Sequence, residues 1–306
     1  MSEKESELKF KFHENYFKLN LSLLPTHYQS TDSSRLTLVY FCLSAMDLLS
    51  IKQETNADWI LNQLIESDVE YGFRGGPFMG HLWGSKEPIN EYDQPDGLDK
   101  INPKKLTAYM SKFQKEDGSF SPTIDSTESD MRFLFCACAI SYILNDWSGI
   151  NIEKALNFIK QSQNYDGAFG CAPDNESHGG STYCAVAALA LMGKLDTVKQ
   201  DKLINKPDDT CYAYWIGGSL KMLGAYQFVD VERLEKFLNS TLGLRGGYGK
   251  NDPKYPDVMH SYMGLVGLAI AGKYDLKPFH VALGVSIDAV EKAKLNGFCS
   301  AYQKIN

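Results

Sequence analysis

The sequence has no stretch long and apolar enough to cross a lipid bilayer. Its longest nearly uncharged run is roughly Phe133 to Leu144, short of the about 18 apolar residues that a membrane helix needs. The first residues, MSEKESELKFKF, are charged and lack the apolar segment of a secretory signal. We therefore expect a cytoplasmic protein without membrane insertion.

Disulfide bonds and a nucleic-acid surface are not indicated either. The seven cysteines are an odd number without the spacing of a disulfide framework, which favours buried thiols or metal ligands in a reducing compartment. Lys and Arg do not cluster, and the formal net charge of -7 argues against a nucleic-acid partner. With 43% hydrophobic and 23% charged residues, the chain is typical of a globular protein with a large core.

An internal repeat of about 49 residues organises the chain. The segment QKEDGSF at Gln114–Phe120 recurs as QNYDGAF at Gln163–Phe169, and Gly246-Gly247-Tyr248 stands at the equivalent place further on. Apolar segments follow in two pairs at the same offset: Arg132–Leu144 with Ser181–Gly193, and Cys211–Leu223 with His260–Gly272. Four repeat units are therefore visible in the sequence.

Each unit has the pattern of two helices of different character. Ile152–Gln163 places apolar residues on one stripe and charges on the other, which is typical of a helix at the surface. Residues 183–192 are apolar almost all round and rich in Ala, which favours burial on both sides. The DG and GG pairs supply the positive φ values that reverse the chain between helices. The pattern predicts an all-α protein in which outer and inner helices form a double-layered solenoid or ring.

The repeat is interrupted in two places, near residues 92–107 and 194–206. From Ser181 to Cys211 the spacing is about 19 residues shorter than the period, so one outer helix and its turn are missing or collapsed. Near residues 92–107, Pro95, Gly97 and Pro103 stand where an apolar inner helix is expected. Both units are therefore shortened.

Polar residues recur at the start of the otherwise apolar inner helices. Because equivalent positions in a repeat lie at the same end of the ring, we expect their side chains to face a common space. Asp209, Cys211 and His260 could form a tetrahedral zinc set with one position left for a further ligand, as in catalytic zinc sites. The structural alternative is an Asp at a helix N-cap and a Cys in the core.

A second set of polar residues suggests an anion site at the same end. It comprises His178, Arg132, Lys206, Tyr212 and Lys250. Helix N-termini attract phosphate groups through free N–H groups and the helix dipole. Solvation at the surface or helix capping would explain any one of these residues alone, but their common location favours a binding site.

Long segments of the chain resemble the protein prenyltransferase β-subunit family, and within it the β subunits of type I geranylgeranyltransferases. The segments are SSRLTLVYFCLSAMDLL, ESDMRFLFCACAISYILNDWSG, ESHGGSTYCAVAALALMGKL, NKPDDTCYAYWIGGSLKML and GGYGKNDPKYPDVMHSYMGLVGL. The resemblance implies one α-α toroid domain over residues 1–306 that pairs with an alpha subunit and binds one zinc ion. The implied reaction transfers geranylgeranyl from its diphosphate to the cysteine of Caax sequences ending in Leu or Phe, on small GTPases.

The resemblance also implies roles for single residues. The zinc ligands would be Asp209, Cys211 and His260, the catalytic set. The diphosphate contacts would be His178, Lys206 and Tyr212.

The resemblance also implies roles for four further residues, three in the substrate pockets and one in the magnesium requirement. Arg132 would line the isoprenoid pocket, and Phe133 would help to form the pocket for the Caax sequence. Thr37 stands where farnesylating relatives carry a Trp that blocks the fourth isoprene unit, and it borders both pockets. Lys250 stands where those relatives bind magnesium with an Asp, so magnesium should not be required.

Two departures from the family pattern coincide with the interruptions of the repeat. The family's diphosphate-binding Arg before NKP is absent, and its position reads Leu203. A family helix that shapes the Caax pocket is absent near residues 92–107. An alternative is therefore a non-catalytic or impaired toroid that binds the alpha subunit or lipid. Farnesyl-type or Rab-type subunits are disfavoured by Thr37, Lys250 and the segment ESHGGSTYC, and a terpene cyclase by the lack of a DxDD motif.

Overall fold

The computed structural model describes residues 3–22, 28, 34–52, 57–67, 70–76, 100–197 and 208–302. Lys206 and Leu203 lie outside the described residues, as do residues 92–99 and 198–206 of the two shortened regions.

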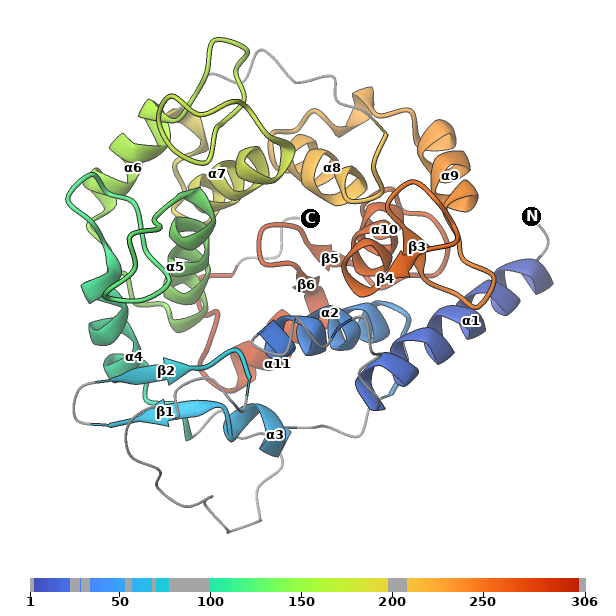
Figure 1. Ribbon diagram of the computed structural model, residues 1–306, viewed down its shortest axis with the longest axis horizontal. Helices are drawn as coiled ribbons and strands as arrows, with labels where there is room; N and C mark the ends of the chain where they lie inside the picture. The colour runs from blue at the N-terminus through green and yellow to red at the C-terminus, as the bar shows by residue number, and fades with distance from the viewer. Residues whose placement is uncertain are drawn as a thin grey trace.

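The described helices form two layers around a ring (Figure 1). The inner layer consists of α2 (Arg35–Leu48), α5 (Met131–Leu144), α7 (Gly179–Leu191), α8 (Tyr212–Met222) and α10 (Val258–Ile270). Outside them lie α1 (Glu3–Ser22), α3 (Ala57–Leu61), α4 (Pro103–Met110), α6 (Ile152–Gln161) and α9 (Val231–Ser240). Around the ring α5 packs on α7, α7 on α8, α8 on α10, and α10 on α2. The predicted ring of helical hairpins is confirmed.

Three short antiparallel hairpins and a last helix complete the described fold. The strands are β1 (Leu64–Glu66) with β2 (Tyr71–Phe73), β3 (Tyr248–Gly249) with β4 (Pro256–Asp257), and β5 (Phe279–His280) with β6 (Val285–Ser286). Helix α11 spans Ile287–Leu295. The hairpin of β3 and β4 leads directly into α10, and it is therefore next to the site described below.

Burial separates the inner from the outer helices as the sequence predicts. In α7 every residue from Ser181 to Leu189 is buried, whereas α6 buries Ala155, Phe158 and Ile159 and exposes Glu153 and Lys160. Helix α6 ends two residues before the predicted Gln163, because Gln163 already pairs with Phe169 across the following turn. Small inner-layer residues permit close packing of neighbouring helices.

The turns between outer and inner helices need glycine, as predicted. Gly118, Gly167 and Gly246 have φ values of 95°, 82° and 88°, in the region that residues with a side chain rarely adopt. At Gly246 the space is also closed, since a Cβ atom there would lie 2.3 Å from the carbonyl oxygen of Phe12 in α1. This turn therefore lies directly against the backbone of the N-terminal helix.

Gly246→Ala is expected to destabilise the fold more than the same change at an open turn. A left-handed conformation costs alanine about 1–2 kcal/mol at either place. Gly272 has a φ of 65° with no atom within 4 Å of its hypothetical Cβ, so Gly272→Ala is the matched control. Overpacking against α1 should add about 1–3 kcal/mol in Gly246→Ala alone, measured by denaturant unfolding. Equal losses of stability in the two variants would contradict the close packing of α1.

A ring of tyrosine hydroxyls joins the inner helices to the loop between β5 and β6. The tyrosines come from four different helices: Tyr40 of α2, Tyr183 of α7, Tyr214 of α8 and Tyr262 of α10. Tyr183 and Tyr214 donate to the carbonyl of Val281, and Tyr40 and Tyr262 donate to that of Gly284, at 2.6 to 3.2 Å. Figure 1 shows this hairpin in the centre of the ring. The loop is thus tied to four helices at once.

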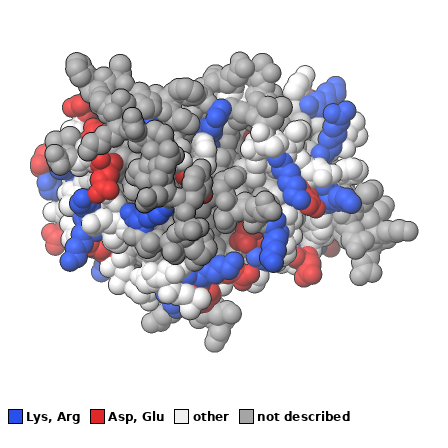
Figure 2. Space-filling model, turned by 90° about the horizontal axis from the view of Figure 1, so that it is seen from below, with Lys and Arg blue, Asp and Glu red and all other residues white. Residues whose placement is uncertain are grey.

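Charged side chains are dispersed over the face that Figure 2 shows. Where the residues are described, Lys and Arg alternate with Asp and Glu on this face. Within the described residues, no helix combines the length and the apolar character that a membrane span requires.

Candidate metal centre

The first part of the site is the short segment that precedes α8. The backbone N–H of Cys211 donates to Asp209 Oδ1 at 2.9 Å, which orients the carboxylate along the start of the helix. Thr210, fully buried between them, donates its hydroxyl to the carbonyl of Gly249 and its backbone N–H to that of Lys250. Asp209 and Cys211 are therefore held against the end of β3.

The second part is the first turn of α10. Asp257 caps this helix, since its Oδ1 accepts a hydrogen bond from the backbone N–H of His260 at 2.9 Å. Its Oδ2 lies 2.5 Å from Nδ1 of the same histidine. One carboxylate thus fixes both the backbone and the ring of His260, which leaves Nε2 to face Asp209.

Asp209, Cys211 and His260 offer three ligand atoms that all lie within 4.8 Å of one another. Asp209 Oδ1 and His260 Nε2 are 3.3 Å apart, close to the roughly 3.3–3.6 Å between ligand atoms of a tetrahedral zinc ion. Oxygen, nitrogen and sulfur donors together suit zinc, and three protein ligands leave one position for a substrate group. The bond from Asp257 to the second ring nitrogen is the arrangement that orients metal-binding histidines. These residues therefore fit a catalytic zinc site.

The charges around His260 also suit a cation. Burial disfavours the imidazolium, but hydrogen bonds to Asp209 and Asp257 outweigh it and raise the pKa of His260 to about 11. Burial opposes ionisation of Asp209, yet hydrogen bonds from His260 and Cys211 hold its pKa well below the usual range. Burial raises the pKa of the Cys211 thiol. A divalent cation would take the place of the proton on Nε2 and favour the thiolate.

Lys250 lies beside Asp209, one of the three candidate ligand residues. Its Nζ is 3.6 Å from Asp209 Oδ2, and its side chain is 63% exposed, so the ammonium can turn toward a bound anion. Its backbone carbonyl accepts the N–H of Thr210 at 2.9 Å. The residue therefore contacts the metal-ligand segment through both its backbone and its side chain.

His178 and Tyr212 form a second pair next to the ligand residues. Tyr212 follows Cys211 in the chain, and its ring centroid lies 6.4 Å from that of His178, edge to face. His178 Nδ1 accepts the backbone N–H of Gly180 at 3.1 Å at the start of α7. Because Nδ1 accepts this hydrogen bond, the ring proton is on Nε2, and since His178 is an exposed residue this N–H can donate to an anion.

Arg132, Phe133 and Thr37 lie on other inner helices. The Arg132 guanidinium is bound by Asp130 and Glu128, each at 2.5 Å, and lies 5.3 Å from the ring centroid of Phe133. The hydrogen bonds to Asp130 raise the pKa of Arg132. Thr37 is exposed in the first turn of α2, which packs on α10. The structure thus places all three residues at the starts of inner helices, but among them only Arg132 and Phe133 are in contact with each other.

Two residues of the site were missed in the sequence analysis. Asp257 stands three residues before His260, and this i, i+3 spacing at a helix start could have identified it as the partner of the ring. Thr210 gives no comparable signal, because its role depends on contacts with β3.

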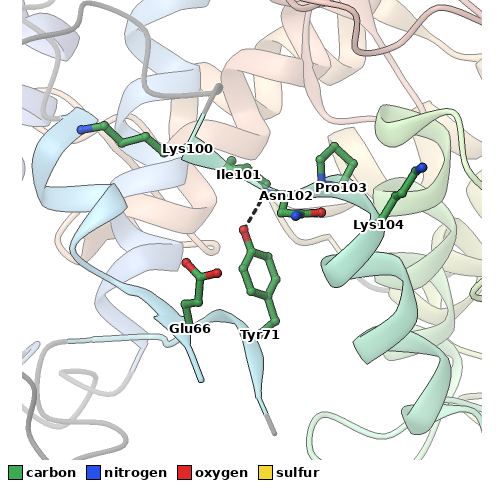
Figure 3. Close-up of a pocket in the computed structure, with 7 residues that line it drawn as sticks. All are labelled: Glu66, Tyr71, Lys100, Ile101, Asn102, Pro103 and Lys104. Atoms are coloured by element: carbon green, nitrogen blue, oxygen red, sulfur yellow. Dashed lines mark hydrogen bonds between the residues drawn. The ribbon is translucent and has the colours of Figure 1, made fainter. Parts of the chain in front are cut away.

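A cavity of about 560 Å³ lies elsewhere in the ring, between the first hairpin and α4 (Figure 3). Its lining residues are Glu66, Tyr71, Lys100, Ile101, Asn102, Pro103 and Lys104. The Tyr71 hydroxyl accepts the backbone N–H of Asn102 at 2.6 Å, while the side chains of Lys100 and Lys104 point away from each other. The cavity therefore lacks convergent charges.

Comparison with known proteins finds close likenesses over almost the whole chain. A family model described as "Prenyltransferase alpha-alpha toroid domain" matches residues 8–205 and 204–285. The chain is 34% identical to the geranylgeranyl transferase type-1 subunit beta of Arabidopsis thaliana, over 90% of this chain and 88% of that protein. It is also 34% identical to the type-1 subunit beta of Dictyostelium discoideum, over 90% and 95%. Candida albicans protein geranylgeranyltransferase-I complexed with GGPP has a similar structure, with a TM-score of 0.79, 26% identity and coverage of 93% and 98%.

The same comparisons bear on the shortened units. The alignment with the Arabidopsis protein extends over 331 positions, which exceeds the 306 residues of this chain, so that relative contains residues without a counterpart here. The two parts of the family match meet at residues 204 and 205, inside the predicted interruption at 194–206.

Proposed function

Because the chain belongs to the prenyltransferase family built on the alpha-alpha toroid, we propose that it is the catalytic beta subunit of a type I protein geranylgeranyltransferase. The substrates are geranylgeranyl diphosphate and small GTPases with a Caax sequence ending in Leu or Phe. The partner is a prenyltransferase alpha subunit, and the enzyme works in the cytoplasm. The observation that carries this proposal is the convergence of Asp209, Cys211 and His260 within a ring so similar to type-1 beta subunits.

The three ligand residues would hold one zinc ion. Zinc bound there would lower the pKa of the substrate cysteine thiol and so supply a thiolate at neutral pH. The substrate thiolate attacks C1 of geranylgeranyl diphosphate, a C–S bond forms, the C–O bond breaks and diphosphate leaves. Asp257 keeps His260 in the orientation that binding requires.

The departing diphosphate is stabilised by donors at the same end of the ring. His178 donates through Nε2, Tyr212 through its hydroxyl and Lys250 through its ammonium group. A well-placed donor of this kind contributes roughly 3–4 kcal/mol in the transition state. Lys206 is assigned the same role on the family resemblance alone, and Lys250 makes magnesium unnecessary.

Three residues contact the two substrates in this proposal. Arg132 lines the isoprenoid pocket, and Phe133 borders the Caax pocket. Thr37, small and exposed at the start of α2, leaves room for a C20 lipid. The farnesyl-type alternative is less favoured for this reason.

The second candidate is a toroid that binds the alpha subunit or lipid without turnover. The family resemblance favours it in one respect, since the implied diphosphate-binding Arg is absent and its position reads Leu203. Retention of three metal ligands around a free fourth position favours catalysis, because a non-catalytic partner does not need that position.

The deciding experiment is transfer of radiolabelled geranylgeranyl to a Caax-Leu protein by this chain co-expressed with an alpha subunit. We expect transfer without added magnesium, and we expect a zinc chelator to abolish it. Zinc and alpha-subunit binding without transfer would instead identify a non-catalytic partner.

A further inference from the structure

The N-terminal helix α1 packs on the hairpin that carries part of the candidate site. His13 is buried, its Nδ1 accepts the backbone N–H of Gly247 at 3.3 Å, and its ring centroid lies 4.9 Å from that of Tyr248. Figure 1 shows α1 running beside β3 and β4. Helix α1 is therefore in direct contact with the segment that ends at Asp257.

Two tyrosines from the N-terminal part of the chain reach the first turn of α10. The Tyr28 hydroxyl accepts the backbone N–H of Val258 at 2.9 Å. The hydroxyl of Tyr16, from α1, interacts with the hydroxyls of Ser261 and Tyr28. A Cβ atom on Gly247 would lie 2.9 Å from both Tyr16 Cζ and Ser261 Oγ, so Tyr16 and Ser261 both pack against Gly247.

Ser261 connects the tyrosines to His260, one of the candidate metal ligands. Its fully buried hydroxyl donates to the backbone carbonyl of Asp257 at 2.5 Å and accepts the backbone N–H of Tyr248 at 2.8 Å. Asp257 in turn binds both the backbone and Nδ1 of His260. A continuous series of contacts and hydrogen bonds therefore connects α1 to the ring of His260.

We propose that Tyr16 and Tyr28 are positioning residues for the metal centre, which hold the first turn of α10 so that His260 Nε2 faces Asp209 and Cys211. The inference rests on the proposed zinc site. The first N–H groups of a helix have no partner within the helix, and the partly buried Tyr28 hydroxyl supplies one for the Val258 amide. Partners that orient metal ligands are worth about 10- to 100-fold in metal affinity.

The test is zinc affinity of the full chain with its alpha subunit, measured by competition with a chromogenic chelator. Tyr28→Phe removes only the hydroxyl, and affinity should fall by about tenfold. The cobalt-substituted variant should also show a changed visible absorption band, because the ligand field follows the position of the imidazole. Tyr71→Phe is the matched control, since its hydroxyl likewise accepts a backbone N–H at a helix start, that of α4. That variant should bind zinc as the unchanged chain does.

Tyr16→Phe is the second variant, because it leaves the amide of Val258 paired and is therefore safer for folding. Its zinc affinity should fall in the same direction. The positioning role would be overturned if folded Tyr28→Phe and Tyr16→Phe had the same zinc affinity and cobalt spectra as Tyr71→Phe. The proposed function would remain intact in that case. Failure of the unchanged complex to bind zinc would overturn both.

Discussion

Replacing Cys211 by serine is expected to remove zinc from the purified complex and with it the transfer activity. Cys211 supplies one of three ligand atoms within 4.8 Å of one another, and a serine hydroxyl is a far weaker zinc ligand at neutral pH. If a protein zinc site contributes about 10–16 kcal/mol, loss of one ligand should cost roughly 3–5 kcal/mol, or about 150- to 5000-fold in affinity. Metal content by mass spectrometry and single-turnover transfer measure the two effects.

Cys184→Ser provides the matched control for this variant. Cys184 lies in α7 and is 7% exposed against 8% for Cys211, so both changes place a hydroxyl at a similarly buried position. Both variants should lose stability, but only Cys211→Ser should lose metal. One equivalent of zinc retained in Cys211→Ser would show that the ligand assignment is wrong.

Lys250→Ala is expected to lower the transfer rate by about 100-fold or more while zinc stays bound. The Lys250 side chain is exposed at the surface, its Nζ lies 3.6 Å from Asp209 Oδ2, and in the proposed mechanism it neutralises the departing diphosphate. Lys250→Asp should behave differently, because a carboxylate there could bind magnesium and let the added ion restore part of the rate. Single-turnover rates with and without magnesium distinguish these outcomes.

Lys254 offers the control, since it is exposed on the same loop between β3 and β4. Lys254→Ala should transfer at the normal rate. A Lys250→Ala enzyme as active as Lys254→Ala would place the diphosphate elsewhere.

The repeat made the ring predictable from the sequence. The 49-residue period and its DG turns at Gly118 and Gly167 reflect the preferences of residues that are neighbours in the sequence. Helices α6 and α7 accordingly lie where the pattern placed them. The register also indicated which helix starts lie together, and Asp209, Cys211 and His260 do converge. Local pattern and shared register were therefore sufficient for the architecture.

Contacts between segments outside the repeat could not be predicted in the same way. Tyr28 lies 230 positions from Val258, and neither residue has a periodic signal that would pair them. The packing of α1 on Gly246 likewise depends on the absence of a side chain, which the sequence analysis explained by turn geometry alone. The ion pairs of Arg132 with Asp130 and Glu128 were also not foreseen, because spacing alone does not decide between a bound ligand and a neighbouring carboxylate.

The four tyrosine hydroxyls that meet at Val281 and Gly284 bear on how the protein is made. Helix α2 leaves the ribosome long before α10 and the loop after β5, yet those later segments cover its buried face and bind Tyr40. During translation the growing ring must therefore expose apolar surface until nearly all of its helices exist. We expect the nascent chain to depend on chaperones and to reach its final shape only after synthesis of the β5–β6 hairpin, which would favour slow, late assembly over stepwise folding from the N-terminus.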